Sequence, residues 1–266
     1  MDNCYSLGKP LNKDLLDENT SWHDTIETLQ NELSEVGVGE DHTLKLSCFL
    51  YASHLNHQPL LLAGPYGALI ANAFSASLHG KTAGVLDCGA NVSSDALHET
   101  ETSDDSVVII KNVFHTPLLS AVIDLLQNAE KQYFVVHPFV EDLLIELRSL
   151  YDYIHPVFTG MFIDKFPGKG EIVGGMNMPS YEEHGSVRAS SDALLRQMHL
   201  AKYADRRLRQ VLADARDMLG SEDKDMDFLL AYLPYAYVTG QTELLTDMRQ
   251  ALSKNARECI ARFMDD

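Results

Sequence analysis

Residues 58–78, with the sequence QPLLLAGPYGALIANAFSASL, decide the fold of this chain of 266 residues. The apolar run Leu60 to Ala63 comes near the start of this stretch, and four turn residues follow it: Gly64, Pro65, Tyr66 and Gly67. A short apolar run before glycine and proline predicts a buried strand, and the Ala- and Leu-rich residues after the turn predict a helix. Strand, turn and helix in this order form the repeating unit of a parallel sheet.

The same unit is the framework of a phosphate-binding loop, which requires the pattern G-x-x-x-x-G-K-[ST] so that backbone amides and a lysine surround the phosphates. When the pattern is aligned with residues 64–71, only its first glycine is matched, by Gly64. Leu69 stands at the second glycine, Ile70 at the lysine, and Ala71 at the hydroxyl that would bind magnesium. We therefore expect the turn to shape the backbone, and Leu69 and Ile70 to plug or line the place where phosphates would lie.

A second stretch, Gly80-Lys81-Thr82, has the letters of a phosphate loop but the wrong surroundings. It follows a predicted helix and precedes a predicted strand at residues 83–88. A phosphate loop has the opposite order, because its amides lie at the start of a helix. We interpret these three residues as a turn between helix and strand.

The composition is that of an ordinary globular protein, with 45% hydrophobic and 23% charged residues. A net charge of −18 argues against direct binding to nucleic-acid backbone, which requires Lys and Arg to neutralise phosphates. The longest apolar run is broken at Gly64-Pro65, so we expect no membrane span. Cys4, Cys48, Cys88 and Cys259 show no C-x-x-C spacing, and we expect reduced thiols in a cytoplasmic protein with no bound metal.

Strands and helices alternate through the first two thirds of the chain. Beyond the opening unit, strands are predicted at residues 107–110, 133–137 and 153–158, with helices at 116–131 and 140–150 between them. This alternation predicts an α/β fold with a doubly wound, mainly parallel sheet.

Three regions follow from the composition along the chain. Residues 1–18 are polar and are interpreted as an extended or mobile arm, residues 19–178 as the α/β domain, and residues 179–266 as an α-helical lid domain. Within the α/β domain, Ser21 and Asp24 predict a capped helix start. Helices at about 193–219, 224–238 and 241–264 make up the last region.

This order of strands, turn and helices resembles that of the AAA+ (P-loop) ATPases, in particular their MoxR and McrB-like branch. The segment LLLAGPYG is similar to the LLxGPPG segment of these proteins. The resemblance covers about residues 40–240. In that family the third strand ends in two acidic residues that hold magnesium and activate water. Here the strand 107–110 ends in Lys111 and Asn112, so both carboxylates are missing. The resemblance therefore implies a degenerate member that does not hydrolyse ATP.

Two residues compete for the polar sensor position of the family. Counting strands along the chain favours His137, which lies in the segment YFVVHP. Local sequence similarity to the G-T-M-N of the McrB branch favours Asn177, which lies in the segment EIVGGMN. Both alternatives stay open at the level of sequence.

A cluster of basic residues lies at the start of the last region. Six basic and two acidic residues fall between Arg196 and Arg216 in a chain that is otherwise strongly acidic. They form either a solvated helix face or a docking surface, and the candidates for docking are Arg196, Lys202, Arg206, Arg207 and Arg209.

Three functions remain in view. The first is a catalytically silent AAA+-like scaffold or regulatory subunit without a cofactor, which contacts a protein partner or an AAA+ subunit and can form a homo-oligomer. The second is an atypical ATPase, or a protein that binds ATP or ADP without hydrolysis, in which Lys81 or Lys111 supplies the phosphate charge. The third is an α/β protein unrelated to AAA+ that binds a small molecule or nucleic acid beside Gly64.

Overall fold

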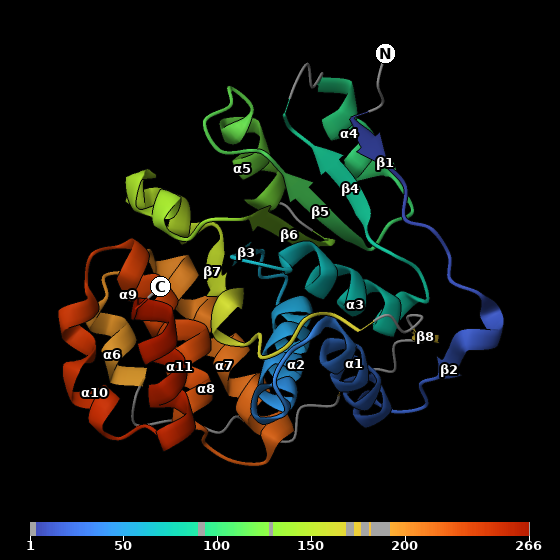
Figure 1. Ribbon diagram of the computed structural model, residues 1–266. Coiled ribbons are helices and arrows are strands. Elements are labelled where there is room, and N and C mark those ends of the chain that lie inside the picture. The colour runs from blue at the N-terminus through green and yellow to red at the C-terminus, as the bar shows by residue number, and fades with distance from the viewer. Residues whose placement is uncertain are drawn as a thin grey trace.

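The computed structural model describes residues 4–89, 94–127, 130–168, 173–176, 181 and 192–265. Its centre is a six-stranded sheet in the order β1-β4-β5-β6-β3-β7 (Figure 1). The six strands are β1 (Tyr5–Ser6), β3 (Leu60–Ala63), β4 (Gly84–Asp87), β5 (Val107–Lys111), β6 (Gln132–His137) and β7 (His155–Phe158). All neighbours pair in parallel except β1, which is antiparallel to β4. The predicted α/β fold with a mainly parallel sheet is confirmed.

Strand β3 lies inside the sheet, between β6 and β7. Numbered along the chain from β3, the five parallel strands run in the order 5-1-4-3-2. Leu60, Leu61 and Leu62 are completely buried, as expected for a strand covered on both faces.

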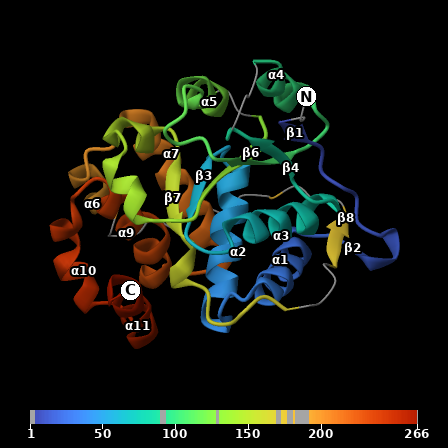
Figure 2. The ribbon, with the colours of Figure 1, turned by 45° about the horizontal axis from the view of Figure 1, so that its top comes forward.

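Helices cover both faces of the sheet (Figures 1 and 2). The chain advances in one direction from β3 to β4 and in the other from β4 to β6, and right-handed crossovers therefore place the connecting helices on opposite faces. Helix α3 lies on one face, together with α1 and α2, which precede β3 in the chain. Helices α4 and α5 lie on the other face. These helices are α1 (Trp22–Val36), α2 (Glu40–Leu55), α3 (Gly67–His79), α4 (Ser94–Thr102) and α5 (Leu119–Gln127).

The start of α1 confirms the predicted cap. The Ser21 side chain accepts from the Asp24 amide, and the Asp24 carboxylate accepts from the Ser21 amide at 2.9 Å. Gly37, with φ 105°, ends the helix.

The described part of the first 18 residues contains two short strands and a 3₁₀ turn, and its first strand, β1, pairs with the sheet. Tyr5 on β1 is buried, and its hydroxyl donates to Asp105 at 2.6 Å. Asp105 is only 2% exposed. Further along, β2 (Leu16–Glu18) pairs in parallel with β8 (Gly174–Met176).

Helices of varied length fill the last part of the chain, beside β7 and α2 (Figure 1). The predicted helix at 193–219 is interrupted after Gln197, and that at 241–264 is divided into three pieces. The helices are α6 (Asp192–Gln197), α7 (Lys202–Leu219), α8 (Lys224–Asp227), α9 (Leu233–Val238), α10 (Thr246–Gln250) and α11 (Lys254–Asp265). A π-helical turn, Phe228–Tyr232, joins α8 to α9, and a 3₁₀ turn, Thr242–Leu245, leads into α10.

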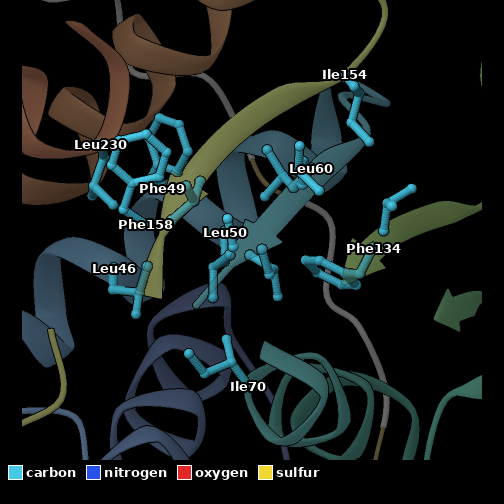
Figure 3. Close-up of a cluster of buried hydrophobic side chains, with 14 of the residues drawn as sticks. Leu46, Phe49, Leu50, Leu60, Ile70, Phe134, Ile154, Phe158 and Leu230 are labelled. Atoms are coloured by element: carbon cyan, nitrogen blue, oxygen red, sulfur yellow. The ribbon is translucent and has the colours of Figure 1, made fainter. Parts of the chain in front are cut away.

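One buried hydrogen bond joins these helices to the sheet. Leu230 lies in the π-helical turn, and Pro234, four residues later, has no N–H to donate to its carbonyl. His155 on β7 donates to it from Nε2 at 2.7 Å. Burial lowers the pKa of His155 to about 4, so the ring is neutral at pH 7. Figure 3 shows Leu230 in the core beside Phe49 and Phe158.

We predict that His155→Leu lowers the free energy of unfolding by about 1–3 kcal/mol, because a buried carbonyl loses its partner. In the Pro234→Ala variant, residue 234 has an amide that is expected to donate to the Leu230 carbonyl. His155→Leu is therefore expected to lower the free energy of unfolding by less in this background. Urea denaturation of the four proteins, analysed as a double-mutant cycle, measures the difference. Equal losses in the two backgrounds would contradict this account.

Candidate functional site

A cavity of about 380 Å³ lies at the carboxyl edge of the parallel strands. Ligands of open α/β sheets bind at this edge, where the strand order reverses. Its walls come from the turns after β3, β6 and β7 and from the C-terminal helix α11: Gly64, Pro65, Pro138 to Glu141, Gly160, Met161, Ile163, Cys259, Arg262 and Phe263.

The turn after β3 is held rigidly in place. The Gly64 amide donates to the carbonyl of His137 at 2.9 Å, and φ of Gly64 is 111°. The Thr159 hydroxyl lies 3.1 Å from the Ala63 carbonyl and 2.7 Å from the Pro65 carbonyl. These contacts join the ends of β3, β6 and β7 into one wall, and they leave Thr159 only 2.9 Å from the place where a Gly64 Cβ would lie.

Helix α3 begins at Gly67, three residues before the position that the phosphate-loop pattern gives to lysine. The segment that would curve around phosphates is therefore the first helical turn, and the amide of Ile70 donates to the Tyr66 carbonyl at 3.0 Å. Ile70 and Ala71 are fully buried, and Figure 3 shows Ile70 within the hydrophobic core.

Leu69 and Ile70 were expected to plug or line the phosphate position, and neither residue belongs to the wall of the cavity beside Gly64. Ile70 faces the core, and Leu69 is 40% exposed and is not part of the cavity wall. The reason is the early helix start, which turns residue 70 toward the sheet. A lysine at this position would point away from the cavity.

Of the two sensor candidates, His137 lies beside the Gly64 turn. It ends β6, pairs with Ala63 in the ladder, and places Nε2 3.2 Å from a carboxylate oxygen of Asp142. Asn177 lies outside the described residues. The residues before it, Gly174–Met176, belong to the separate pairing with β2, so the phrase GGMN does not follow a strand of the main sheet.

The candidate strand-end residues of β5 lie away from the cavity. Lys111 pairs with Asp87 in the ladder, and Asn112 donates to the Asp87 carboxylate at 2.9 Å. This hydrogen bond lowers the pKa of Asp87. Strand β6 separates this pair from the Gly64 turn.

Lys81 lies at the opposite edge of the sheet, because it precedes β4 in the chain. Gly80 ends α3 with φ 60°, which confirms the interpretation as a turn between helix and strand. The Lys81 ammonium donates to Asp105 at 2.8 Å and to the Asp104 carbonyl at 2.9 Å. Its position and its contacts keep it from the cavity at the carboxyl edge.

The basic residues of α6 and α7 do not form one continuous docking surface. Arg196, Lys202 and Arg206 are exposed. Arg207 is half-buried, which lowers its pKa, and Arg209 donates to the Asp205 carboxylate at 2.7 and 2.9 Å. Three of the five candidates therefore remain available to a partner of acidic character.

Sequence reasoning did not find the cluster around Cys259. Cys259 and His42 are separated by 217 residues, and their Sγ and Nε2 atoms lie 3.1 Å apart. Arg262, one turn further along α11, donates to the same sulfur at 3.4 Å and to Asp164 at 2.9 Å. No short motif marks residues so far apart in the chain.

Neither metal clusters nor membrane-spanning helices are found in the part of the chain that the structure describes. It contains no group of three or more His, Cys, Asp or Glu residues placed to hold a metal ion. None of its helices is both long and apolar enough to cross a bilayer.

Comparison with protein-family models, curated proteins and solved structures finds no match to this chain.

We predict that Gly64→Ala destabilises the protein by about 2–3 kcal/mol, through an unfavourable φ and contact with Thr159. Gly220→Ala is the matched control, because Gly220 also has positive φ, 69°, but has no atom within 4 Å of an added Cβ. The control is expected to lose about 1 kcal/mol. Thermal and urea unfolding measure both variants, and equal losses would show that Thr159 does not confine the turn.

Proposed function

We propose that this chain is a catalytically silent, AAA+-like protein that acts through protein–protein contacts, as a scaffold or a regulatory subunit. The parallel sheet with the turn-bearing strand β3 in its interior supports the resemblance. The early start of α3 and the burial of Ile70 support the silent character, since phosphoryl transfer depends on groups positioned around the phosphates.

The observation that carries the protein-binding function is an exposed apolar ridge after β6. Four large side chains within nine residues face solvent, with exposed fractions of 61%, 51%, 72% and 76%: Phe139, Leu144, Ile145 and Leu147. Exposed apolar residues are common singly, whereas a cluster of this kind marks an interaction surface.

The backbone of the ridge holds these side chains outward. The helix predicted at 140–150 is instead two 3₁₀ helices, Glu141–Ile145 and Arg148–Asp152, separated by extended residues. In a 3₁₀ helix, residues three apart lie on one side, so Val140 and Leu143 are both buried and anchor the segment. The residues between and beyond these anchors therefore point into solvent.

Charge indicates the chemistry of the partner. Glu141 and Asp142 lie on the ridge, and the whole chain has a net charge of −18. A partner with an apolar groove or face bordered by Lys or Arg is complementary to this surface. A second copy of the same acidic chain, as in a homo-oligomer, gains less from charge, because both surfaces carry an excess of acidic residues.

We predict that a synthetic amphipathic helix with Lys beside its apolar face binds the protein, and that the same peptide with Glu in place of Lys does not. Fluorescence anisotropy measures both, and added salt is expected to weaken binding. The double variant Ile145→Ser, Leu147→Ser is expected to lose binding with little change in stability, since both side chains are exposed.

The matched control for the ridge is Leu7→Ser, which replaces a leucine that is 64% exposed elsewhere on the surface. It is expected to bind the Lys peptide as the wild type does. Equal binding of the two peptides, or full binding by the double variant, would argue against the ridge as a docking surface for a basic partner.

We predict that calorimetric titration with ATP or ADP and magnesium gives no binding heat. The turn at Gly64 has no lysine, and Lys81 is paired with Asp105 at the other edge of the sheet. Micromolar binding of either nucleotide would overturn the silent reading and favour the atypical ATPase. In that event Lys111→Ala identifies whether Lys111 supplies the phosphate charge.

The cavity supports a second candidate, which is an α/β protein that binds a small molecule beside Gly64. Its volume of about 380 Å³ suits a ligand of a few tens of atoms at most. Apolar residues from the turns and from α11 make up most of its wall, with Arg262 and Glu141 as charged groups.

A further inference from the structure

The sulfur of Cys259 has more polar neighbours than a structural thiol requires. His42 Nε2 lies 3.1 Å from Sγ, the Met161 carbonyl oxygen lies 3.1 Å away, and Arg262 donates from Nη2 at 3.4 Å. Cys48 is an internal contrast, because it is fully buried in the core and no polar contact to its sulfur is found within the described ranges.

The three groups around Cys259 have distinct chemical roles. A neutral imidazole within hydrogen-bond distance of a thiol can accept its proton, which is the arrangement of an activated nucleophile. Burial lowers the pKa of His42 and so favours the neutral form of the ring. Burial also raises the pKa of the Cys259 thiol, so the resting pair is uncharged. The Arg262 guanidinium then stabilises the thiolate as it forms.

The Arg262 side chain is held in position by a second contact. Nη1 donates to the Asp164 carboxylate at 2.9 Å, while Nη2 reaches the sulfur. Asp164 also faces His42, and Lys45 and Asp41 lie close enough to affect its ring. The exposed ion pair between Arg262 and Asp164 places a positive charge beside Cys259.

Two hollows give access to this cluster. Cys259 and Arg262 line the cavity of about 380 Å³ beside Gly64. His42, Asp164 and Arg262 line a wider hollow of about 880 Å³ on the other side of α11. Cys259 as a whole is 1% exposed, so only a small reagent that enters a hollow reaches the sulfur.

We propose that Cys259 is a nucleophilic thiol that undergoes exchange with small disulfides, with His42 as its base and Arg262 as the group that stabilises the thiolate. In the exchange, Sγ attacks one sulfur of the disulfide, an S–S bond forms to Cys259, and the original S–S bond breaks. The leaving thiolate takes the proton that His42 removed from Cys259. One disulfide and one thiol enter, one disulfide and one thiol leave, and no further oxidant is needed.

The site does not depend on the ridge or on the AAA+ resemblance. It uses residues of α2, of α11 and of the segment after β7. Disulfide exchange at Cys259 would attach a group covalently inside the cavity.

The test uses the full chain and, as the probe, the disulfide of 2-mercaptoethanol, which is small enough for a cavity of about 380 Å³. After timed incubation, peptide mass mapping measures the fraction of each cysteine that carries mercaptoethanol. Cys259 is expected to react about tenfold faster than Cys48 or more, because a positioned base assists it.

His42→Gln separates base assistance from simple access, and its fold is checked by circular dichroism. It is expected to slow the reaction at Cys259 by about tenfold and to leave the rate at Cys88 unchanged. Cys259 reacting no faster than Cys48 in the wild type would overturn the proposal without any variant. A rate unchanged in folded His42→Gln would also overturn it.

Discussion

The structure depends on the burial of β3 on every side. Its two edges are hydrogen-bonded to β6 and β7, and its side chains are fully buried. The chain after Ala63 therefore leaves the sheet only at the carboxyl edge, between the ends of the neighbouring strands. There the Thr159 hydroxyl and the His137 carbonyl fix the turn, so the geometry of the candidate site is a consequence of the core.

The C-terminal helix α11 completes the site mainly through apolar contact. Ala256, Cys259 and Ile260 are each 1% exposed, and Phe263 stacks on Phe158 of β7 at 5.0 Å. The pair Arg262–Asp164 is exposed and contributes little to stability by itself. Its contribution is positional, because it holds the guanidinium against the sulfur of Cys259.

Local patterns predicted the five parallel strands, the capped start of α1 and the helix after the Gly64 turn, because those features depend on neighbouring residues. They did not predict where α3 begins, since glycine at position 67 allows either a loop or a helix. Nor did they predict the burial of Asp105 or the contact between His42 and Cys259, which arise from residues far apart in the chain. The hydrogen bond from His155 to Leu230 had a local signal in Pro234, but its donor came from another element.

Phe139 connects the two candidate surfaces, because it belongs to the apolar ridge and also lines the cavity. It directly follows Pro138 at the end of β6, and Val140 after it is buried. A partner that covers the ridge therefore covers one wall of the cavity as well. A group attached at Cys259 occupies the same cavity from the side of α11. The two surfaces share one boundary, so occupation of either changes the space available to the other.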